Sequence, residues 1–385
     1  MNEYTYVEEF FMFSKVRWGR VALVAIAGIA AVISGFFIFG GRLQHQVVVE
    51  STHRLFGTSK VNLLVLGYQD DEATTDTIIL AHLDVDRRTA TLVSIPRDTW
   101  VAIPGNGYQK INAAYAFGGA KMTARVVSTL LGGVPIDAIV ALQPEGAAQI
   151  VDAMGGLNVD VDEDMNYDDD NGDLHIHLKK GEQYLTGGQV AGYLRFRHDA
   201  ASDYGRMKRQ QQVLKLMMDQ LSQPQNWAKL PRILQFARKD VKTTLGNQQM
   251  LALLEIYRDV PEDDIRAFTL PSKPGWVGDA SVVFVDARWA KLIGKLLFLK
   301  TDPPQDQIVV ANATGDTDFD KTIVGALRGG GWNVQTSIDQ PAKPTSVVVG
   351  DSPAAQALAQ VFAAPLRPGT GSTLLIGSDL TPDTE

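Results

Sequence analysis

The sequence of 385 residues contains no cysteine, and this absence limits the chemistry of the protein. Without cysteine there is no disulfide bond, no thiol nucleophile and no cysteine-ligated zinc site. The G-x-x-x-x-G-K-[ST] phosphate loop is also missing, since residues 118–123 (GGAKMT) depart from that pattern. A G-x-S-x-G nucleophile turn is missing as well. The sequence therefore gives no sign of these catalytic devices.

Basic residues are in the minority: 36 Lys and Arg stand against 44 Asp and Glu, for a formal net charge of -8. An extended basic face is needed to neutralise the phosphates of nucleic acid, so we expect no nucleic-acid partner. A local exception lies at residues 195–209, where five Lys or Arg stand against two Asp. A short basic cluster of this kind can bind a small anionic group.

One apolar run is long: residues 21–39 (VALVAIAGIAAVISGFFIF) hold no charged residue. As a helix at about 1.5 Å per residue the run spans roughly 28 Å, close to the hydrocarbon thickness of a bilayer. Basic residues precede it, at Lys15, Arg17 and Arg20. The positive-inside rule then predicts a single-pass plasma-membrane protein with a cytoplasmic N-terminus and an extracytoplasmic main part. A cleaved signal peptide or a buried core helix are the alternatives, and the lack of an A-x-A site favours the anchor.

The rest of the pattern predicts two folded units of the α/β class. We expect a cytoplasmic tail at 1–20, a transmembrane helix at 21–39, a juxtamembrane connector at 40–59, a larger α/β domain at 60–300 and a small C-terminal α/β domain at 306–385. The Pro-rich segment 301–305 (TDPPQ) is the predicted linker between the two units. Beyond it, strand-like and helix-like segments alternate.

Periodicity predicts the main elements of the larger unit. We expect a buried strand at 61–69, two strands within 75–100 with a turn near 86–88, a helix at 112–132 broken by two glycines, and a short helix at 144–156 closed by glycines. Residues 157–165 predict a strand that runs into a solvated acidic turn at 162–173. Residues 173–187 alternate as one half-exposed strand, with His175 and His177 on one face. Without cysteine or more histidine nearby, zinc is not expected there.

The basic segment predicts a helix at 202–221 with Ser202 or Asp203 at its N-cap. Its apolar stripe, Val213, Met217 and Leu221, leads back at helical spacing to polar residues, Gln210 and Arg206. An inward-facing arginine needs an anionic partner. We expect Arg195 and Arg197 to share one face of the preceding strand, so that three arginines converge near the helix N-terminus. A structural salt-bridge cluster with Asp199 and Asp203 is the alternative.

Two further clusters lie at strand ends, where α/β folds keep their sites. Arg97 and Asp98 end an otherwise apolar strand; the alternative is a turn with a local Asp hydrogen bond. Three carboxylates, Asp70, Asp71 and Asp76, flank another strand end and suit a hard cation such as Mg²⁺. The alternative there is a solvated acidic loop.

Taken in order, the motifs resemble the LytR–CpsA–Psr (LCP) family of cell-wall enzymes. The resemblance rests on VNLLVLG, TDTIIL, TLVSIPRDTW, KINAAYAFGG, IVDAMGGLNVDV, DEDMNYDD and LRFRHDAASDYGRMKRQQQ. It covers roughly residues 60–222 and, more loosely, extends to about 300; residues 306–380 are similar to the C-terminal domain often appended to this family. The resemblance implies an LCP-type α-β-α domain with a central mixed sheet and an apolar pocket for a polyprenyl chain.

The resemblance also implies a function: transfer of a glycopolymer from an undecaprenyl-pyrophosphate carrier to peptidoglycan at the bilayer surface, with Mg²⁺. Arg97, Asp98, Arg195 and Arg197 become the predicted catalytic residues, with Asp98 as candidate base. The predicted pyrophosphate contacts are Arg97, Arg195, Arg197, Arg206 and Gln210. The predicted metal ligands are Asp76 and Asp70.

Two positions differ from the family pattern. Gln69 stands where the family has its first metal-binding Asp, so Asp70 or Asp71 would have to replace it. Thr74 stands where the family has an Arg before its Ser-Asp-Thr. Two other functions therefore stay open: a pyrophosphatase of lipid-linked pyrophosphates, and a non-catalytic module that binds polyprenyl pyrophosphate or the cell wall.

Overall fold

The computed structural model describes residues 45–69, 74–169, 174–196, 241–298, 302–315 and 317–380, together with 209, 212, 213, 216, 217, 220 and 300. In these parts of the chain no helix is both long and apolar enough to cross a membrane. The predicted transmembrane helix at residues 21–39 lies outside them. Within the predicted connector, residues His45–Phe56 form a helix, α2.

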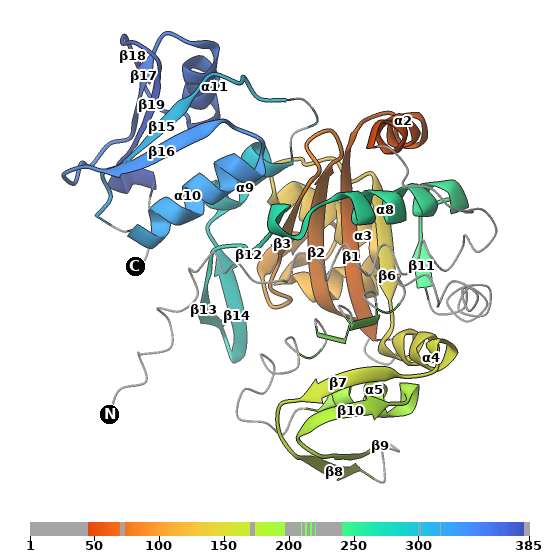
Figure 1. Ribbon diagram of the computed structural model, residues 1–385. Helices are drawn as coiled ribbons and strands as arrows, with labels where there is room; N and C mark the ends of the chain where they lie inside the picture. Colours follow the sequence, from red (N-terminus) through yellow and green to blue (C-terminus); the bar gives the residue numbers. More distant parts are fainter. Residues whose placement is uncertain are drawn as a thin grey trace.

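A six-stranded mixed sheet forms the centre of the larger unit, in the order β11-β6-β1-β2-β3-β12 (Figure 1). Its strands are β1 (Lys60–Gln69), β2 (Thr74–Asp84), β3 (Thr89–Ser94), β6 (Ala138–Leu142), β11 (Val241–Thr243) and β12 (Ile265–Thr269). β1, β2 and β3 are antiparallel neighbours, whereas β6 runs parallel to β1 and β12 parallel to β3. The central mixed sheet, the strand at 61–69 and the two strands that follow it are confirmed.

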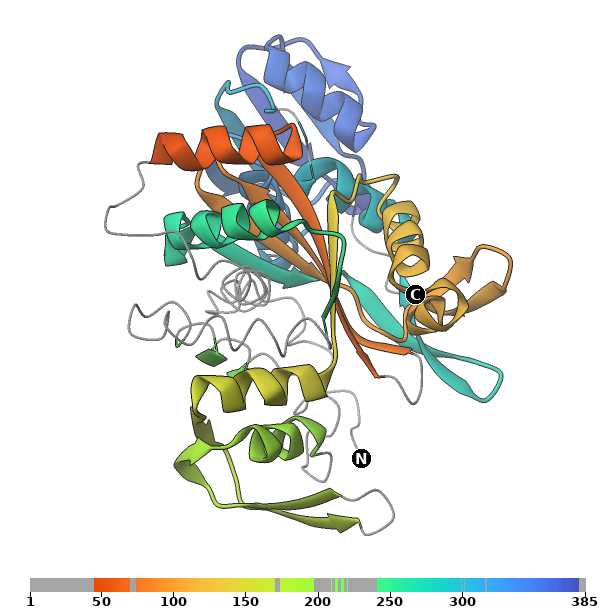
Figure 2. The same ribbon diagram turned by 90° about the vertical axis from the view of Figure 1, so that its right-hand side faces the viewer.

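Both faces of this sheet are covered, because alternate side chains of β1 point into different cores. Leu63 and Val65 lie in the core beneath α2 and α8 (Asn247–Asp259). Leu64 and Leu66 lie in the core beneath α3 (Ala114–Leu130) and α9 (Ala287–Leu297). Figure 2 shows α2 and α8 on one side of the sheet and α3 on the other. The near-continuous apolar sequence of β1 follows from this burial on both faces.

The helix α3 follows a short 3-10 turn (Ile111–Ala113) and loses helical geometry at Gly118 and Gly119. Gly119 has a φ of 61°, in the left-handed region that glycine adopts at little steric cost. The predicted glycine break in this helix is therefore confirmed. The helix α4 (Pro144–Met154) is confirmed as well, and it ends at Gly155 in the left-handed conformation.

A smaller lobe follows α4 and contains two hairpin-like pairs: β7 (Leu157–Val161) with β10 (Gly181–Leu185), and β8 (Met165–Asp169) with β9 (Leu174–Leu178). Two predictions are wrong here. The acidic segment contains a strand, β8, because Met165 and Tyr167 alternate inward against β9. The single strand expected at 173–187 is two strands, and Gly181, with a φ of 107°, opens the second. His175 and His177 do share a face of β9, and both approach Asp168.

The next element corrects the placement of Arg195: it lies on a helix, α5 (Gly187–Arg195), and not on a strand. Thr186 and Gln189 form a capping box at the N-terminus of this helix. Val190, Tyr193 and Leu194 are buried at helical spacing. The arginine therefore stands in the last turn of a helix, with its side chain exposed.

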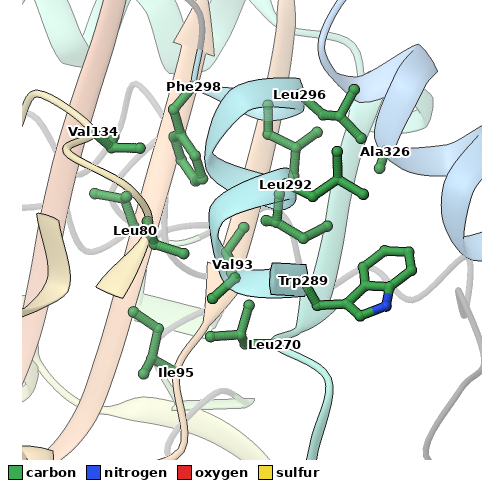
Figure 3. Packing of buried hydrophobic residues seen from close by; sticks show 14 of the residues in the cluster. Leu80, Val93, Ile95, Val134, Leu270, Trp289, Leu292, Leu296, Phe298 and Ala326 are labelled. Atoms are coloured by element: carbon green, nitrogen blue, oxygen red, sulfur yellow. The ribbon is translucent and has the colours of Figure 1, made fainter. Parts of the chain in front are cut away.

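The C-terminal unit has its own five-stranded sheet, in the order β16-β15-β19-β17-β18. Its elements are β15 (Ile308–Asn312), α10 (Thr317–Gly329), β16 (Val334–Asp339), β17 (Val347–Gly350), α11 (Pro353–Phe362), β18 (Leu366–Arg367) and β19 (Ser372–Ile376). The predicted small α/β unit is confirmed. Figure 3 shows Leu292 and Leu296 of α9 between the central sheet and Ala326 of α10. The two units therefore share one hydrophobic core through α9.

Two short hairpins complete the larger unit: β4 (Trp100–Ile103) with β5 (Gly107–Lys110), and β13 (Ser272–Val277) with β14 (Ala280–Val285). An isolated parallel bridge between Thr99 and Val283 joins them. They project from the same side of the molecule, in orange and teal (Figure 2).

Candidate functional site

One end of the central sheet brings together three predicted site residues, Asp76, Arg97 and Asp98, because β1 ends there, β2 begins there and β3 leaves the sheet. A bulge interrupts the pairing of β1 with β2: Gly67 lies opposite Thr77 and Tyr68 opposite Thr75, so that Asp76 is the extra residue. Bulges of this kind redirect a side chain and recur beside active sites. The bulge explains how Asp76 departs from the regular pairing of a strand that is apolar from Ile78 to Ala81.

Arg97 reaches this bulge from the segment after β3, and its guanidinium forms an ion pair with the Asp76 carboxylate. The Nε atom of the same guanidinium lies 3.7 Å from Asp98 Oδ2. Lys110 Nζ, from β5, lies 2.8 Å from Asp98 Oδ1. We call Asp76, Arg97, Asp98 and Lys110 the charge cluster. Two cations and two carboxylates alternate in it, and the sequence did not point to Lys110.

Backbone hydrogen bonds hold Arg97 and Asp98 in place. Pro96 O accepts from Thr99 N at 3.1 Å and from Thr99 Oγ1 at 2.6 Å, which closes a turn. Arg97 O accepts from Asn112 N at 3.1 Å, and Asp98 O accepts from Val283 N at 2.9 Å. The segment is thus a turn, as the alternative reading held, but Thr99 closes it. The Asp98 carboxylate does not close the turn and belongs to the charge cluster instead.

The charge cluster is only partly shielded from solvent. The side chains of Arg97, Asp98 and Lys110 are 25%, 31% and 34% exposed, whereas that of Asp76 is 8% exposed. Cations in this intermediate environment attract anions more strongly than fully solvated ones do, because the effective dielectric constant is lower. The arrangement can therefore bind a phosphate-like anion at Arg97 and Lys110.

A second group of residues adjoins the bulge and was missed by sequence reasoning. The ring of Tyr68 stacks on that of Tyr115, with centroids 4.7 Å apart. Lys242 Nζ, from the edge strand β11, lies 4.5 Å from the centroid of the Tyr68 ring. Burial, with the Tyr68 phenol as the next cause, raises the pKa of Tyr115. No local sequence signal links these residues, since β11 joins the sheet about a hundred residues after β6.

Thr75, the cross-strand partner of Tyr68, is fully buried. Among the described residues, its hydroxyl has no hydrogen-bond partner. An unpaired buried hydroxyl costs free energy of roughly 1–3 kcal/mol. Such a group is uncommon in folded proteins, and it lies one residue from Asp76.

The structure describes only part of the predicted basic cluster. Arg195 is exposed at the end of α5. Four other predicted site residues, Arg197, Arg206, Gln210 and Asp70, lie outside the described residues. The predicted convergence of Arg195, Arg197 and Arg206 therefore stays a prediction.

Arg209, a described residue of the segment after α5, is 4% exposed. Its Nε donates to Tyr193 O at 3.1 Å, and its Nη2 donates to Phe196 O. Both carbonyls belong to the end of α5, where cations are favoured. The helical spacing used for the prediction steps three residues back from Val213, to Gln210. A count of four residues would have reached Arg209.

The described part of the chain contains one of the two predicted metal ligands. There, no group of three or more His, Asp or Glu side chains is placed to hold a metal ion. Of the two predicted ligands, Asp76 is the one that the structure describes. Its carboxylate forms an ion pair with Arg97. Gln69 and Thr74, the two positions that differ from the family pattern, face each other where β1 ends and β2 begins.

The fold and the charge cluster define an α/β domain with alternating acidic and basic side chains at one end of its sheet. The chain belongs to the LytR_cpsA_psr family, whose match spans residues 43–296. Residues 305–380 match a second family, described as LytR cell envelope-related transcriptional attenuator.

Curated relatives carry two kinds of name. The chain is 31% identical over 235 residues to the polyisoprenyl-teichoic acid–peptidoglycan teichoic acid transferase TagV of Bacillus subtilis, covering 58% of this chain and 60% of TagV. It is 36% identical over 204 residues to TagU of Bacillus cereus, which has the same transferase name, covering 52% and 65%. It is also 31% identical over 219 residues to the regulatory protein MsrR of Staphylococcus aureus, covering 56% and 65%. The chain thus spans less than two thirds of the length of these relatives.

Solved structures share the fold of the larger unit. The crystal structure of B. subtilis TagV superposes with a TM-score of 0.53 at 30% identity, covering 62% of this chain and 95% of that chain. A protein of Enterococcus faecalis, EF0465, superposes with a TM-score of 0.51 at 26% identity, covering 62% and 87%.

Proposed function

We propose that the protein is a membrane-anchored phosphotransferase that moves a glycopolymer from an undecaprenyl-pyrophosphate carrier to peptidoglycan. Membership of the LytR_cpsA_psr family and the transferase names of TagV and TagU support the reaction class. The observation that carries the proposal is the contact of Arg97, at the end of β3, with Asp76 in the bulge of β2. The predicted anchor at residues 21–39 would place this site outside the plasma membrane.

The proposed reaction is an attack of a peptidoglycan sugar hydroxyl on the phosphorus that carries the glycopolymer. The new P–O bond forms to the acceptor oxygen, and the P–O bond to the bridging oxygen of the pyrophosphate breaks. Polyprenyl phosphate leaves with that oxygen, and the hydroxyl proton passes to a base. Positioning and charge neutralisation supply most of the catalysis in phosphoryl transfer.

Arg97 would neutralise the pyrophosphate, because a planar guanidinium can donate two parallel hydrogen bonds to phosphate oxygens. In the structure Arg97 pairs with Asp76, so a bound anion would compete with that carboxylate. Lys110 adds a second positive charge nearby. Arg195, Arg197, Arg206 and Gln210 complete the proposed clamp, as the family resemblance implies.

Asp98 is our candidate for the base that accepts the proton. Its carboxylate is 31% exposed, and its backbone is fixed by the hydrogen bond from Val283 N. Lys110, 2.8 Å from Oδ1, holds the carboxylate in one orientation. A base must reach the proton that it removes, and an accessible, oriented carboxylate meets that need.

Mg²⁺ stays part of the proposal through the family resemblance. When bound, it would neutralise charge on the pyrophosphate. Asp76, with Asp70, would hold it after the Asp76 carboxylate had exchanged Arg97 for the metal. The described residues alone do not form such a site, so none of the steps above depends on the ion.

The test uses full-length protein in detergent micelles, a lipid-pyrophosphate oligosaccharide and peptidoglycan fragments, with and without Mg²⁺. Coupled glycopolymer–peptidoglycan together with released polyprenyl phosphate supports the proposal. Release of polyprenyl phosphate and sugar phosphate without coupling indicates a pyrophosphatase. Saturable lipid binding without turnover indicates a binding module. Either of the last two outcomes overturns the transferase assignment.

A further inference from the structure

Lys242, on the edge strand β11, reaches across the sheet on the face that α3 covers. It lies opposite Ala141 of β6, which in turn lies opposite Leu66 of β1. Opposite residues of paired strands point to one face, and Ala141, Leu66 and Tyr68 all belong to the core beneath α3. The Lys242 ammonium lies 4.5 Å from the centroid of the Tyr68 ring. The lysine side chain therefore passes over β6 and ends above β1.

The contact with Tyr68 brings this ammonium beside the charge cluster. Thr75 lies opposite Tyr68 and precedes Asp76, the ion-pair partner of Arg97. In the direction across the sheet, an ammonium above β1 is one strand spacing, about 4.8 Å, from β2, which carries Asp76. A pyrophosphate has oxygens on two phosphorus atoms and can bridge a gap of this order. One ligand can thus contact both cations.

The start of α3 is in contact with both cations. Arg97 O accepts from Asn112 N at 3.1 Å, in the 3-10 turn that precedes α3. Tyr115, three residues further on, stacks on Tyr68. The Lys242 ammonium also faces the Tyr115 phenol, because it opposes the rise in the pKa of Tyr115 that burial causes. The same turn of chain therefore positions Arg97 and the rings that hold Lys242.

Lys242 differs from the other two cations in its counterions. Arg97 pairs with Asp76 and Lys110 with Asp98, so the charges of the charge cluster cancel. Among the described residues, no carboxylate pairs with Lys242, and its ammonium contacts two tyrosine side chains instead. An aromatic ring attracts a cation without neutralising its charge. Lys242 therefore leaves one positive charge in excess beside the bulge, and an anion that binds it displaces no carboxylate.

The aromatic contact also prepares the lysine for a ligand. A lysine side chain loses much rotamer freedom when its ammonium is fixed by an anion. The contact with Tyr68 has already removed part of that freedom, and the ring of Tyr68 is itself fixed, since this residue is 1% exposed. Lys242 is exposed, so a ligand can reach its ammonium.

We propose that Lys242 is a further anion-binding residue of the candidate site and contacts the pyrophosphate of the polyprenyl-linked donor together with Arg97. The identity of this donor rests on the proposed function. Lys242 supplies the net positive charge that the charge cluster lacks, and its ammonium donates to phosphate oxygens. Tyr68 and Tyr115 are positioning residues that hold the ammonium beside the bulge.

The experiment measures binding of farnesyl pyrophosphate, a short polyprenyl pyrophosphate, to the full-length protein in detergent micelles by calorimetry, with Mg²⁺ in every sample. Lys242→Met removes the charge and keeps an unbranched side chain that packs on an aromatic ring. Lys242→Arg keeps the charge. Lys295→Met is the matched control, because Lys295 is also exposed but lies in the last turn of α9. Phe298, three residues further on, packs against His82, which is six residues along β2 from Asp76.

We expect Lys242→Met to weaken binding about tenfold, Lys242→Arg to stay within about threefold of the wild type, and Lys295→Met to be unchanged. Binding by Lys242→Met should also depend less on salt than binding by the wild type, because one cation fewer meets the ligand. A lysine with a structural role alone would lower the free energy of unfolding and leave this salt dependence unaltered. Urea unfolding of each variant provides that comparison.

Inorganic pyrophosphate, titrated in parallel, identifies the part of the probe that Lys242 contacts. The affinity ratio between the wild type and Lys242→Met should be the same for both probes. A loss confined to farnesyl pyrophosphate would overturn the proposal. So would wild-type affinity in Lys242→Met, equal losses in Lys242→Arg and Lys242→Met, an equal loss in Lys295→Met, or no binding of either probe by the wild type.

Binding requires no turnover, so the Lys242 contact and the transferase reaction can fail separately. Weakened binding in Lys242→Met, with no coupled product from the wild type, would keep the contact and reject the reaction. Coupled product from the wild type, with unchanged binding in Lys242→Met, would keep the reaction and reject the contact.

Discussion

The two ends of the central sheet both carry alternating acidic and basic side chains, but they differ in burial. At the start of β1, Lys60 and Asp84 have side chains that are 4% exposed. At the other end, the side chains of Asp98 and Lys110 are 31% and 34% exposed. The charged side chains at the first end, the closed end, are buried against one another, whereas those at the second end, the open end, are partly exposed to solvent. The same residue types are therefore buried in ion pairs at one end and partly accessible to solvent at the other.

The buried end is a closed network that we call the linker cluster: Lys60, Asp84, Arg87 and Asp302. Asp84 Oδ2 lies 3.1 Å from both Lys60 Nζ and Arg87 Nη1. Asp302 Oδ1 lies 2.6 Å from Lys60 Nζ and 2.8 Å from Arg87 Nη1. A hydrogen bond from Lys60 is the main cause that lowers the pKa of Asp302. The segment predicted as a linker is thus tied to the sheet through Asp302.

The largest stability effect should come from breaking the linker cluster at Asp84. Asp84→Ala leaves the buried ammonium of Lys60 without its most buried partner, and removal of one member of a buried ion pair typically costs 3–5 kcal/mol. We expect a loss of about that size in the free energy of unfolding, measured in urea. Asp302→Ala, whose side chain is 56% exposed, is the control and should cost less than about 1 kcal/mol. Equal losses of unfolding free energy in the two variants would contradict the distinction between the buried Asp84 and the exposed Asp302.

The matching change at the open end is Arg97→Ala, and its main effect should be on function. Removing a guanidinium that stabilises phosphoryl charge is expected to lower the transfer rate about 10²- to 10³-fold. The control is Arg88→Ala, whose side chain is 46% exposed and pairs with Asp259 near the linker cluster. Full transfer activity in Arg97→Ala, measured as coupled product, would reject the charge cluster as the site. Urea unfolding of both variants separates activity loss from misfolding.

Sequence patterns predicted the open end better than the closed one. Charged residues stand at the ends of strongly apolar strands at Asp76, Arg97 and Asp98. A single sequence is enough to recognise the end of an apolar strand. Lys60 carries no comparable signal, because its burial depends on Asp84, Arg87 and Asp302, which only the folded sheet brings together.

Two errors have identifiable causes. The alternation of Arg195 and Arg197 predicts a strand. The helix is instead indicated by Thr186 and Gln189 and by the spacing of Val190, Tyr193 and Leu194. The contact of Lys242 with Tyr68 could not be predicted, since the register of an edge strand with a distant partner is set by the packed sheet. Local signals identified Asp76, Arg97 and Asp98, which are members of one cluster, and non-local pairing brings the other residues of the candidate site beside them.

The pH dependence of stability should report on the closed end through His82. Burial lowers the pKa of His82 from 6.5 to about 3, and its Nδ1 lies 2.6 Å from Asn62 Oδ1. The folded protein thus holds a neutral ring, while the unfolded chain binds a proton below pH 6.5. Stability is therefore lost as pH falls from about 6.5 toward 3, by roughly 1.4 kcal/mol per pH unit.

The check is a series of urea unfolding curves between pH 7.5 and 4.5 for the wild type and His82→Gln. Glutamine keeps a hydrogen-bond donor but does not titrate, so the variant should show a shallower decline over this range. An identical pH slope in both proteins would mean that carboxylates, and not His82, set the acid sensitivity.

The smallest expected change in the free energy of unfolding concerns Thr75. This change should be stabilising, whereas the changes expected at the closed end are destabilising. At the closed end and in the cores, buried hydroxyls are paired: Thr52 Oγ1, also fully buried, donates to Val48 O at 2.7 Å. Thr75 Oγ1, beside the charge cluster, has no hydrogen-bond partner in the part of the chain that the structure describes. Replacing an unpaired hydroxyl by a methyl group of similar shape removes a desolvation penalty, so Thr75→Val should raise the free energy of unfolding by about 1 kcal/mol. Thr52→Val removes a satisfied hydroxyl and should lower it by a similar amount.

Opposite signs for these two conservative substitutions would establish that the open end carries a local cost in stability that the closed end does not. Functional sites commonly retain such costs, since groups arranged for a ligand are not satisfied by the protein alone. Destabilisation by Thr75→Val, in the same urea measurement, would instead mean that the hydroxyl is satisfied in solution, for example by an ordered water. The open end would then differ from the closed end in exposure alone.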